Sequence, residues 1–218
     1  FGLEVGVEKG VPLSAGLGGP AASAVAAIVA ASAVLDEPLS LPERFHYALL
    51  SEELAAGWPH GDNVAPAMLG GLRLVRSTGP FDGLRIPVPH DMGAVVVKPK
   101  LSIDVRRARE LLNKEVQLAD FVAQTANLAG FLSGCFTDDR ALIGRSLQDL
   151  VVEPQRAHLI PGFADVQEAA RAVGAIGCSI SGAGPAIFAI HDFDANPHRI
   201  CEAMIGAFYQ AGVESTAL

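Results

Sequence analysis

The residues best suited to chemistry form a glycine-rich turn at residues 12–23, PLSAGLGGPAAS in one-letter code. Gly16, Gly18 and Gly19 leave backbone N–H groups uncovered by side chains, and glycine lets a ligand approach the main chain closely. The alanine-rich segment that follows predicts a helix, whose first turn adds unpartnered N–H groups and the positive end of the helix dipole. Turn and helix together predict a phosphate site. A tight strand-to-helix corner that binds nothing is the alternative.

Two more segments could take part in the same chemistry. Residues 60–66, HGDNVAP, place an aspartate and an asparagine in a tight loop, and residues 181–185, SGAGP, form a second glycine-rich turn. The first turn lacks the Gly-Lys-Ser/Thr ending of a Walker A loop, and it is not a clean dinucleotide fingerprint. A single glycine-rich turn is a weak signal, so the interpretation depends on all three segments occurring in this order.

Composition limits the class of protein. The 218 residues are 50% hydrophobic and 18% charged, which predicts a folded chain with a sizeable core. A net charge of −8 argues against binding to a nucleic-acid backbone. Cys135, Cys178 and Cys201 lack CxxC spacing and are expected to be buried thiols in a reducing compartment. The longest apolar run, residues 21–35, is short for a membrane span.

The elements that must position these segments alternate between helix and strand. Hydrophobic periodicity, glycine and proline predict helices at residues 20–35, 41–56, 63–69, 105–112, 118–131, 138–148, 163–173 and 196–211. Strands are predicted at residues 3–9, 72–76, 84–87, 93–97, 176–180 and 186–190. Because the order lacks regular βαβ spacing, we expect an α+β fold rather than a Rossmann sheet.

The three chemical segments resemble the sequence motifs of the GHMP kinases. Residues 12–23 resemble the phosphate loop of that family, written P-x-x-x-G-L-G-S-S-A-A, and residues 181–185 match its third motif. Residues 60–66, followed by LGG at residues 69–71, resemble the segment that marks homoserine kinases within the family. The resemblance extends over EPQR at residues 153–156 and IPGF at residues 160–163, so it covers nearly the whole chain.

The resemblance implies the two-domain α+β fold of the GHMP kinases. Residues 1–88 would form part of the N-terminal, ATP-binding domain, with a left-handed β-α-β unit. Residues 89–218 would form a ferredoxin-like C-terminal domain. The family's first motif is absent, so we expect Phe1 to lie mid-domain and one more strand to follow Leu218.

The resemblance also implies an activity, which is the ATP-dependent phosphorylation of the side-chain hydroxyl of L-homoserine to O-phospho-L-homoserine in threonine biosynthesis. The enzyme would use ATP and Mg²⁺ in the cytoplasm, would form a homodimer, and would bind neither nucleic acid nor membrane. Glu52 would bind Mg²⁺, with Glu53 as the adjacent alternative, because a hard cation prefers carboxylate oxygen. The nucleotide would be held by Pro12, Leu13, Ser14, Ala15, Gly16, Leu17, Gly18, Gly19, Pro20, Ala21 and Ala22.

Four residues are implied in substrate binding and catalysis. Asp62 would contact the amino group or hydroxyl of homoserine, and Asn63 would contact its reacting end, so these two form the catalytic pair. An amide can hydrogen-bond a hydroxyl without removing its proton, so we expect direct attack by the substrate hydroxyl. Arg109 and Arg156 align with family arginines that grip the α-carboxylate, which a guanidinium fork matches bidentately.

One departure from the family keeps other functions open. Gly19 and Pro20 replace the paired serines of the phosphate loop, and Pro20 supplies neither a hydroxyl nor an N–H. A non-catalytic nucleotide-binding relative is therefore one alternative. Another is a GHMP kinase for a sugar or an isoprenoid alcohol, but Asp62, Asn63 and the two arginines favour a substrate with an amino-acid head.

Overall fold

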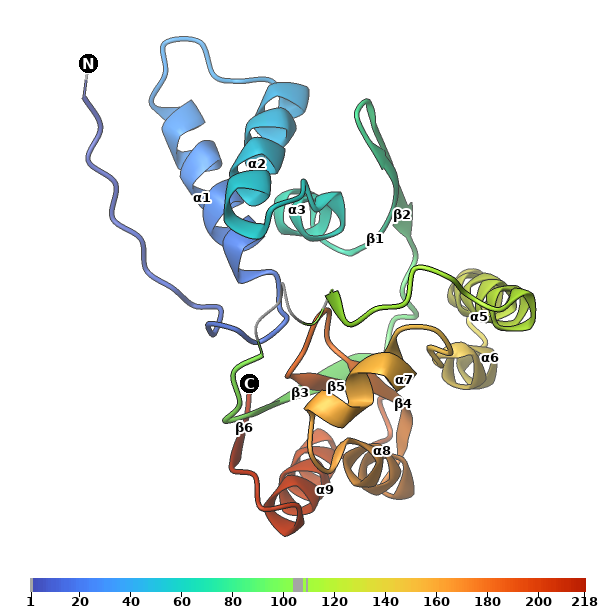
Figure 1. Ribbon diagram of the computed structural model, residues 1–218. Coiled ribbons are helices and arrows are strands. Elements are labelled where there is room, and N and C mark those ends of the chain that lie inside the picture. Colours follow the sequence, from blue (N-terminus) through green and yellow to red (C-terminus); the bar gives the residue numbers. More distant parts are fainter. Residues whose placement is uncertain (1, 104–107, 109) are drawn as a thin grey trace. The chain divides into compact units, whose positions relative to one another are not determined.

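A computed structural model describes residues 2–103, 108 and 110–218, and the chain divides into two compact units (Figure 1). The first unit comprises Phe1–Leu13 and Leu17–Ile86, and the second comprises Ser14–Gly16 and Pro87–Leu218. Within the described ranges, no helix is long and apolar enough to cross a lipid bilayer.

Three helices and a hairpin make up the first unit. They are α1 (Gly19–Ala33), α2 (Leu41–Ala56), α3 (Gly61–Leu69), β1 (Leu72–Thr78) and β2 (Phe81–Ile86). Ser40 and Glu43 form a capping box at the start of α2, where the backbone N–H of Ser40 donates to Glu43 at 2.8 Å. The helices enclose a small core of Ala21, Val25, Phe45, Ala48, Leu49, Val64 and Ala65. Phe81 of the antiparallel hairpin packs against Phe45, with the two rings tilted and their centroids 4.1 Å apart.

The second unit is built on a four-stranded antiparallel sheet with the spatial order β4-β5-β3-β6. Its elements are β3 (Gly93–Pro99), α5 (Leu118–Thr137), α6 (Arg140–Ser146), α7 (Glu153–Arg156), the 3₁₀ helix η1 (Ala157–Leu159), α8 (Phe163–Ala172), β4 (Ala175–Ile180), β5 (Ile187–His191), α9 (Pro197–Gln210) and β6 (Ser215–Ala217). If β3, β4, β5 and β6 are counted as strands one to four of this unit, their order across the sheet is two, three, one, four. This is the ferredoxin-like arrangement, so the predicted α+β class and ferredoxin-like C-terminal part are confirmed.

The main core of the second unit lies where α8 and α9 cover one face of this sheet (Figure 1). Val166 of α8 and Met204 and Phe208 of α9 are fully buried against sheet residues such as Val97 and Ile187. Burying an aliphatic or aromatic side chain of this size contributes roughly 1.5–3 kcal/mol. This packing fixes the strand ends from which the β4–β5 turn projects.

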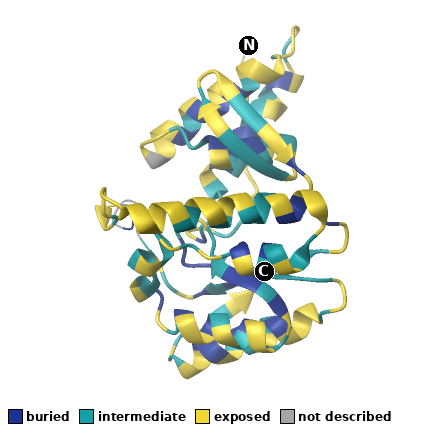
Figure 2. Cartoon of the chain, turned by 90° about the vertical axis from the view of Figure 1, so that its right-hand side faces the viewer, coloured by how far each residue is buried: buried dark blue, intermediate teal, exposed yellow. Residues whose placement is uncertain are grey.

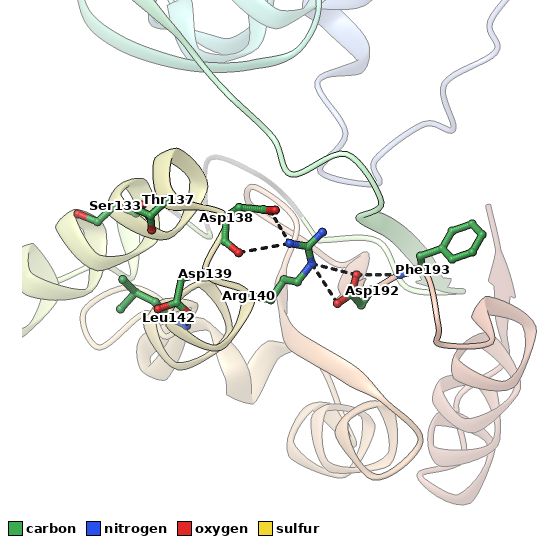
Figure 3. Close-up of polar contacts among 8 residues, drawn as sticks. All are labelled: Ser133, Thr137, Asp138, Asp139, Arg140, Leu142, Asp192 and Phe193. Atoms are coloured by element: carbon green, nitrogen blue, oxygen red, sulfur yellow. Dashed lines mark hydrogen bonds and ion pairs between the residues drawn. The ribbon is translucent and has the colours of Figure 1, made fainter.

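A second helical layer, made of α5 and α6, packs beside β4. Gly134 of α5 allows close contact, since a Cβ there would lie 2.7 Å from the Ile143 side chain of α6. Arg140 at the start of α6 bonds to Asp138 and places its Nε 3.0 Å from Asp192, just after β5 (Figure 3). The backbone N–H of Phe193 and the guanidinium of Arg140 both lower the pKa of Asp192. These contacts tie the α5–α6 turn to the sheet.

Most predicted helices and strands are confirmed, with ends that differ by a few residues. The strand predicted at residues 3–9 is wrong: these residues have no regular structure and are exposed. A strand needs a neighbour for its backbone hydrogen bonds, and no described strand pairs with this segment. The left-handed β-α-β unit depends on that strand and stays a prediction. The helix predicted at residues 105–112 falls largely outside the described residues, and α7, η1 and β6 were not predicted.

Cys178 provides a test of the packing in the second unit. Its side chain is fully buried in β4, and burial raises the pKa of its thiol to about 12. The thiolate is the reactive form of cysteine. In the native protein at mildly alkaline pH, Cys178 should therefore be alkylated on the order of 10³-fold more slowly than an ordinary thiol. Iodoacetamide labelling followed by peptide mass spectrometry measures this, with the partly exposed Cys201 as the internal control. Equal labelling of both cysteines without unfolding would contradict the packing.

Candidate phosphate and substrate site

The backbone angle φ changes sign from residue to residue along the glycine-rich loop. Ser14, Gly16 and Gly18 have φ values of 51°, 75° and 66°, whereas the intervening Ala15 and Leu17 are not among the residues with positive φ. Residues of positive φ that alternate with residues of negative φ can turn successive N–H groups toward one side, and such a concave arrangement binds anions. Gly18 is also the N-cap of α1, so the N–H groups of the first helical turn continue the same run.

The beginning of this loop is docked on the β4–β5 turn of the second unit. The Ser181 hydroxyl donates to the Gly16 carbonyl at 3.0 Å, and the Ala186 N–H donates to the Ala15 carbonyl at 3.3 Å. A Cβ at Gly16 would overlap the Ser181 carbonyl oxygen, and one at Gly182 would lie 2.8 Å from the Gly16 carbonyl oxygen. The third motif therefore holds the loop by contact between main chains, and the Ser181 hydroxyl takes part in this contact.

The end of the loop meets the predicted substrate segment within the first unit. A Cβ built on Gly18 would lie 2.9 Å from Oδ1 of Asn63, so the Asn63 amide rests directly against the loop backbone. Asp62 lies in the first turn of α3, where its Oδ1 accepts from the Asn63 N–H at 3.1 Å. The Asp62 side chain is exposed and lies 3.8 Å from Nδ1 of His60. The structure thus sets Asn63 against the glycine-rich loop, with Asp62 next to it in the first turn of α3.

Pro20 occupies the second position of α1, where its missing N–H has little consequence. The N–H groups of the first turn have no partner within a helix. The first helical hydrogen bond here runs from the Ala22 N–H to the Gly18 carbonyl, at 2.9 Å. The departure from the family's paired serines therefore removes hydroxyls and one N–H but leaves the helix start intact.

Glu52 lies on the buried side of α2, and Glu53 is exposed. Phe45, Ala48, Leu49 and Glu52 follow the i, i+3, i+4, i+7 spacing of one helix face, and the first three belong to the core with α1 and α3. Only 3% of Glu52 is exposed. Burying a carboxylate is costly unless it is compensated, so its position points to a role beyond a solvated surface. A single carboxylate suits Mg²⁺, which takes only one or two and keeps other oxygen ligands.

Arg156 and Arg109 are the two arginines predicted to bind the carboxylate of the substrate. Arg156 ends α7, and its Nε and Nη1 donate to the carbonyls of Ala108 and Gly182 at 3.3 and 3.2 Å. The guanidinium therefore lies beside the third motif and helps to fix it. Arg109 lies outside the described residues.

Glu153, which sequence reasoning assigned no role, anchors the short helix that carries Arg156. One of its carboxylate oxygens accepts from Gln167 of α8 at 3.1 Å, and the other accepts from the Ser179 hydroxyl of β4. Gln167 also donates to the Cys178 carbonyl at 2.8 Å. Because these partners lie far along the chain, no local pattern could have indicated the network. It makes Glu153 a positioning residue for Arg156.

Two models of known protein domains match the chain. The model of the GHMP kinase N-terminal domain matches residues 1–71, and that of the GHMP kinase C-terminal domain matches residues 128–211. The chain belongs to the GHMP kinase family. Both domain models match within this one chain, and the motifs lie in both matched regions.

Homoserine kinases are among the most similar relatives of this GHMP kinase. The enzyme of Xanthomonas campestris is 45% identical over the whole chain, and that of Chlorobium phaeobacteroides is 44% identical over 94% of it. The chain spans 66% and 64% of the lengths of these two relatives. The crystal structure of homoserine kinase from Cytophaga hutchinsonii has a TM-score of 0.91 at 41% identity, covering 96% of this chain and 67% of that one.

The contact between Gly18 and Asn63 can be tested by adding one methyl group. Alanine at position 18 would need a positive φ and would press on the Asn63 amide, so Gly18→Ala should lower the free energy of unfolding by about 1–3 kcal/mol. Gly19→Ala is the matched control: the nearest atom to its Cβ lies 3.9 Å away, and its φ is not positive. Urea denaturation should show little change for that variant. Equal losses in both variants would refute the tight contact.

Proposed function

We propose that the protein is a homoserine kinase, which transfers the terminal phosphoryl group of ATP to the side-chain hydroxyl of L-homoserine. The contact that sets the Asn63 amide against Gly18 in the phosphate loop supports this most directly, because phosphoryl transfer needs the nucleotide and the attacking hydroxyl side by side. The similarity to homoserine kinases over the whole chain supports the choice of substrate.

The nucleotide phosphates would lie along residues 12–22, on the N–H groups that the alternating backbone and the start of α1 present. Glu52 would hold Mg²⁺, which, when bound, neutralises phosphate charge and so favours transfer. The burial of Glu52, on the same face of α2 as Phe45, Ala48 and Leu49, supports its choice over the exposed Glu53.

Homoserine would be recognised by charge at its two ends. The Asp62 carboxylate would bind the ammonium group, and Arg156 with Arg109 would bind the α-carboxylate. Asn63 would hydrogen-bond the reacting hydroxyl. An amide cannot accept a proton as a carboxylate does, so the rate would come from positioning and electrostatics, with no general base at this residue.

The wider assignment follows from the same proposal. Residues 1–88 would belong to the ATP-binding domain and residues 89–218 to the C-terminal domain. The enzyme would act in the cytoplasm as a homodimer, on the route to threonine, without a nucleic-acid or membrane partner.

A coupled ADP-release assay with Mg²⁺ tests the substrate. We expect turnover with homoserine to exceed turnover with mevalonate or galactose by at least about 10³-fold, because a site built to pair with charged groups rejects ligands that lack them. The assay is run on this chain and on a version extended to the length of its relatives. An extended protein that binds ATP without turnover would support a non-catalytic relative instead, and preference for mevalonate or galactose would support a different kinase.

Replacing Arg156 tests how the carboxylate is bound. Arg156→Leu should raise KM for homoserine about 10- to 100-fold, the loss expected for a charge-assisted hydrogen bond, and should change KM for ATP much less. Arg171→Leu, an exposed arginine on α8, is the control. Because Arg156 also binds two backbone carbonyls, the free energy of unfolding is measured alongside. Equal increases in both KM values would refute the carboxylate role.

A further inference from the structure

Helix α5 has an unusual outer face. Five of its large apolar side chains are between 50% and 77% exposed, namely Leu118, Phe121, Val122, Leu128 and Phe136. Figure 2 shows this long helix with much of its length exposed. The one charged residue of its 20 is Asp120. A surface helix ordinarily turns charged residues to solvent and apolar residues to the core, so this face is typical of a contact surface.

Three of the five, Leu118, Val122 and Phe136, lie on a stripe of α5 whose spacing is typical of a helix pair. Leu118, Val122, Thr125, Ala129, Leu132 and Phe136 are spaced alternately by four and three residues along α5. This 3.5-residue period keeps one stripe facing a partner helix. On a helical wheel the stripe lies opposite Gly130 and Gly134, which face α6. The packing of α5 within its own unit therefore leaves most of the stripe exposed, with Leu132 half-buried.

We propose that α5 pairs antiparallel with α5 of a second copy of this chain. The proposal rests on the homodimer of the proposed function and assigns it a surface. A two-fold interface must be complementary to itself, and the alternating spacing reads the same in both directions about residue 127. Antiparallel pairing then sets Leu118 against Phe136, Val122 against Leu132, and Thr125 against Ala129.

The sizes of the side chains that face each other in this antiparallel register are also complementary. The flanking Phe121 would lie opposite the small Ser133, and the small residues Thr125 and Ala129 at the centre let the two helices approach closely. A 20-residue helix is about 30 Å long. Its five exposed large side chains offer on the order of 500 Å² of apolar surface, since an aromatic ring alone contributes about 150–250 Å². With the smaller seam residues and the rim, this approaches the roughly 800 Å² per partner of a standard interface.

Sedimentation velocity tests the surface. The wild-type chain should be a dimer at micromolar concentration, and Phe136→Lys should weaken the dimer at least about 100-fold, because each dimer receives two charges in its seam. Phe193→Lys is the matched control, since Phe193 is 75% exposed and lies apart from Ser133 and Thr137 of α5 in Figure 3. Val122→Lys should repeat the effect of Phe136→Lys, and circular dichroism checks that each variant is folded.

The orientation is tested by disulfide formation between two single variants, Thr125→Cys and Ala129→Cys. Antiparallel pairing brings residue 125 of one copy to residue 129 of the other, so the mixture should cross-link far more than either variant alone. Cross-linking of Ala129→Cys with itself would indicate parallel helices and overturn the register.

Other outcomes would overturn the proposal as a whole. They are a monomeric wild type, a dimer that both lysine variants leave intact, or a longer form of the protein that is monomeric while hydrogen exchange shows its α5 face covered. The outcomes are separate from those for catalysis. A monomer that phosphorylates homoserine overturns only the dimer, and a dimer without turnover overturns only the proposed function.

Discussion

The phosphate loop begins where two stretches of main chain meet with no side chain between them. Neither Gly16 nor Gly182 has room for a Cβ, and the Ser181 hydroxyl closes the contact at 3.0 Å. Such a close approach of two main chains needs glycine. The loop is held only as rigidly as the segment on which it rests. That segment is the β4–β5 turn, whose two strands belong to the sheet that packs against α8 and α9 in the main core. The stability of the second unit therefore determines where the first N–H groups of the loop point.

The other end of the loop depends on a different core. Gly18 caps α1 and touches Asn63, while α1 and α3 pack with α2 around seven small and apolar residues. Glu52 stands on the same face of α2, where a further apolar residue would be expected. A fully buried carboxylate is rare on a helix face that otherwise carries apolar residues, and such departures from a local rule occur mainly at functional sites.

The sequence was sufficient for the elements and for the motifs, because periodicity and glycine spacing are local signals. Periodicity predicted α1 and α2, and glycine spacing singled out residues 12–22. The ferredoxin-like part and the choice of Asn63 came from the resemblance to the GHMP kinases. The sequence failed for residues 3–9, where alternation suggests a strand but no described neighbour pairs with it. It also could not show the network of Glu153, since its partners lie on α8 and β4 and only the tertiary fold brings them together. The backbone alternation at Ser14, Gly16 and Gly18 likewise became visible only in the structure.

The central claim is that main-chain N–H groups of the loop and of the start of α1 hold the phosphates of ATP. A crystal structure with a non-hydrolysable ATP analogue tests it most directly. The account predicts the triphosphate within hydrogen-bond distance of backbone nitrogens between Gly16 and Ala22, with Asn63 beside its terminal phosphate. A triphosphate bound anywhere else on the chain, with these nitrogens uncontacted, would contradict the account.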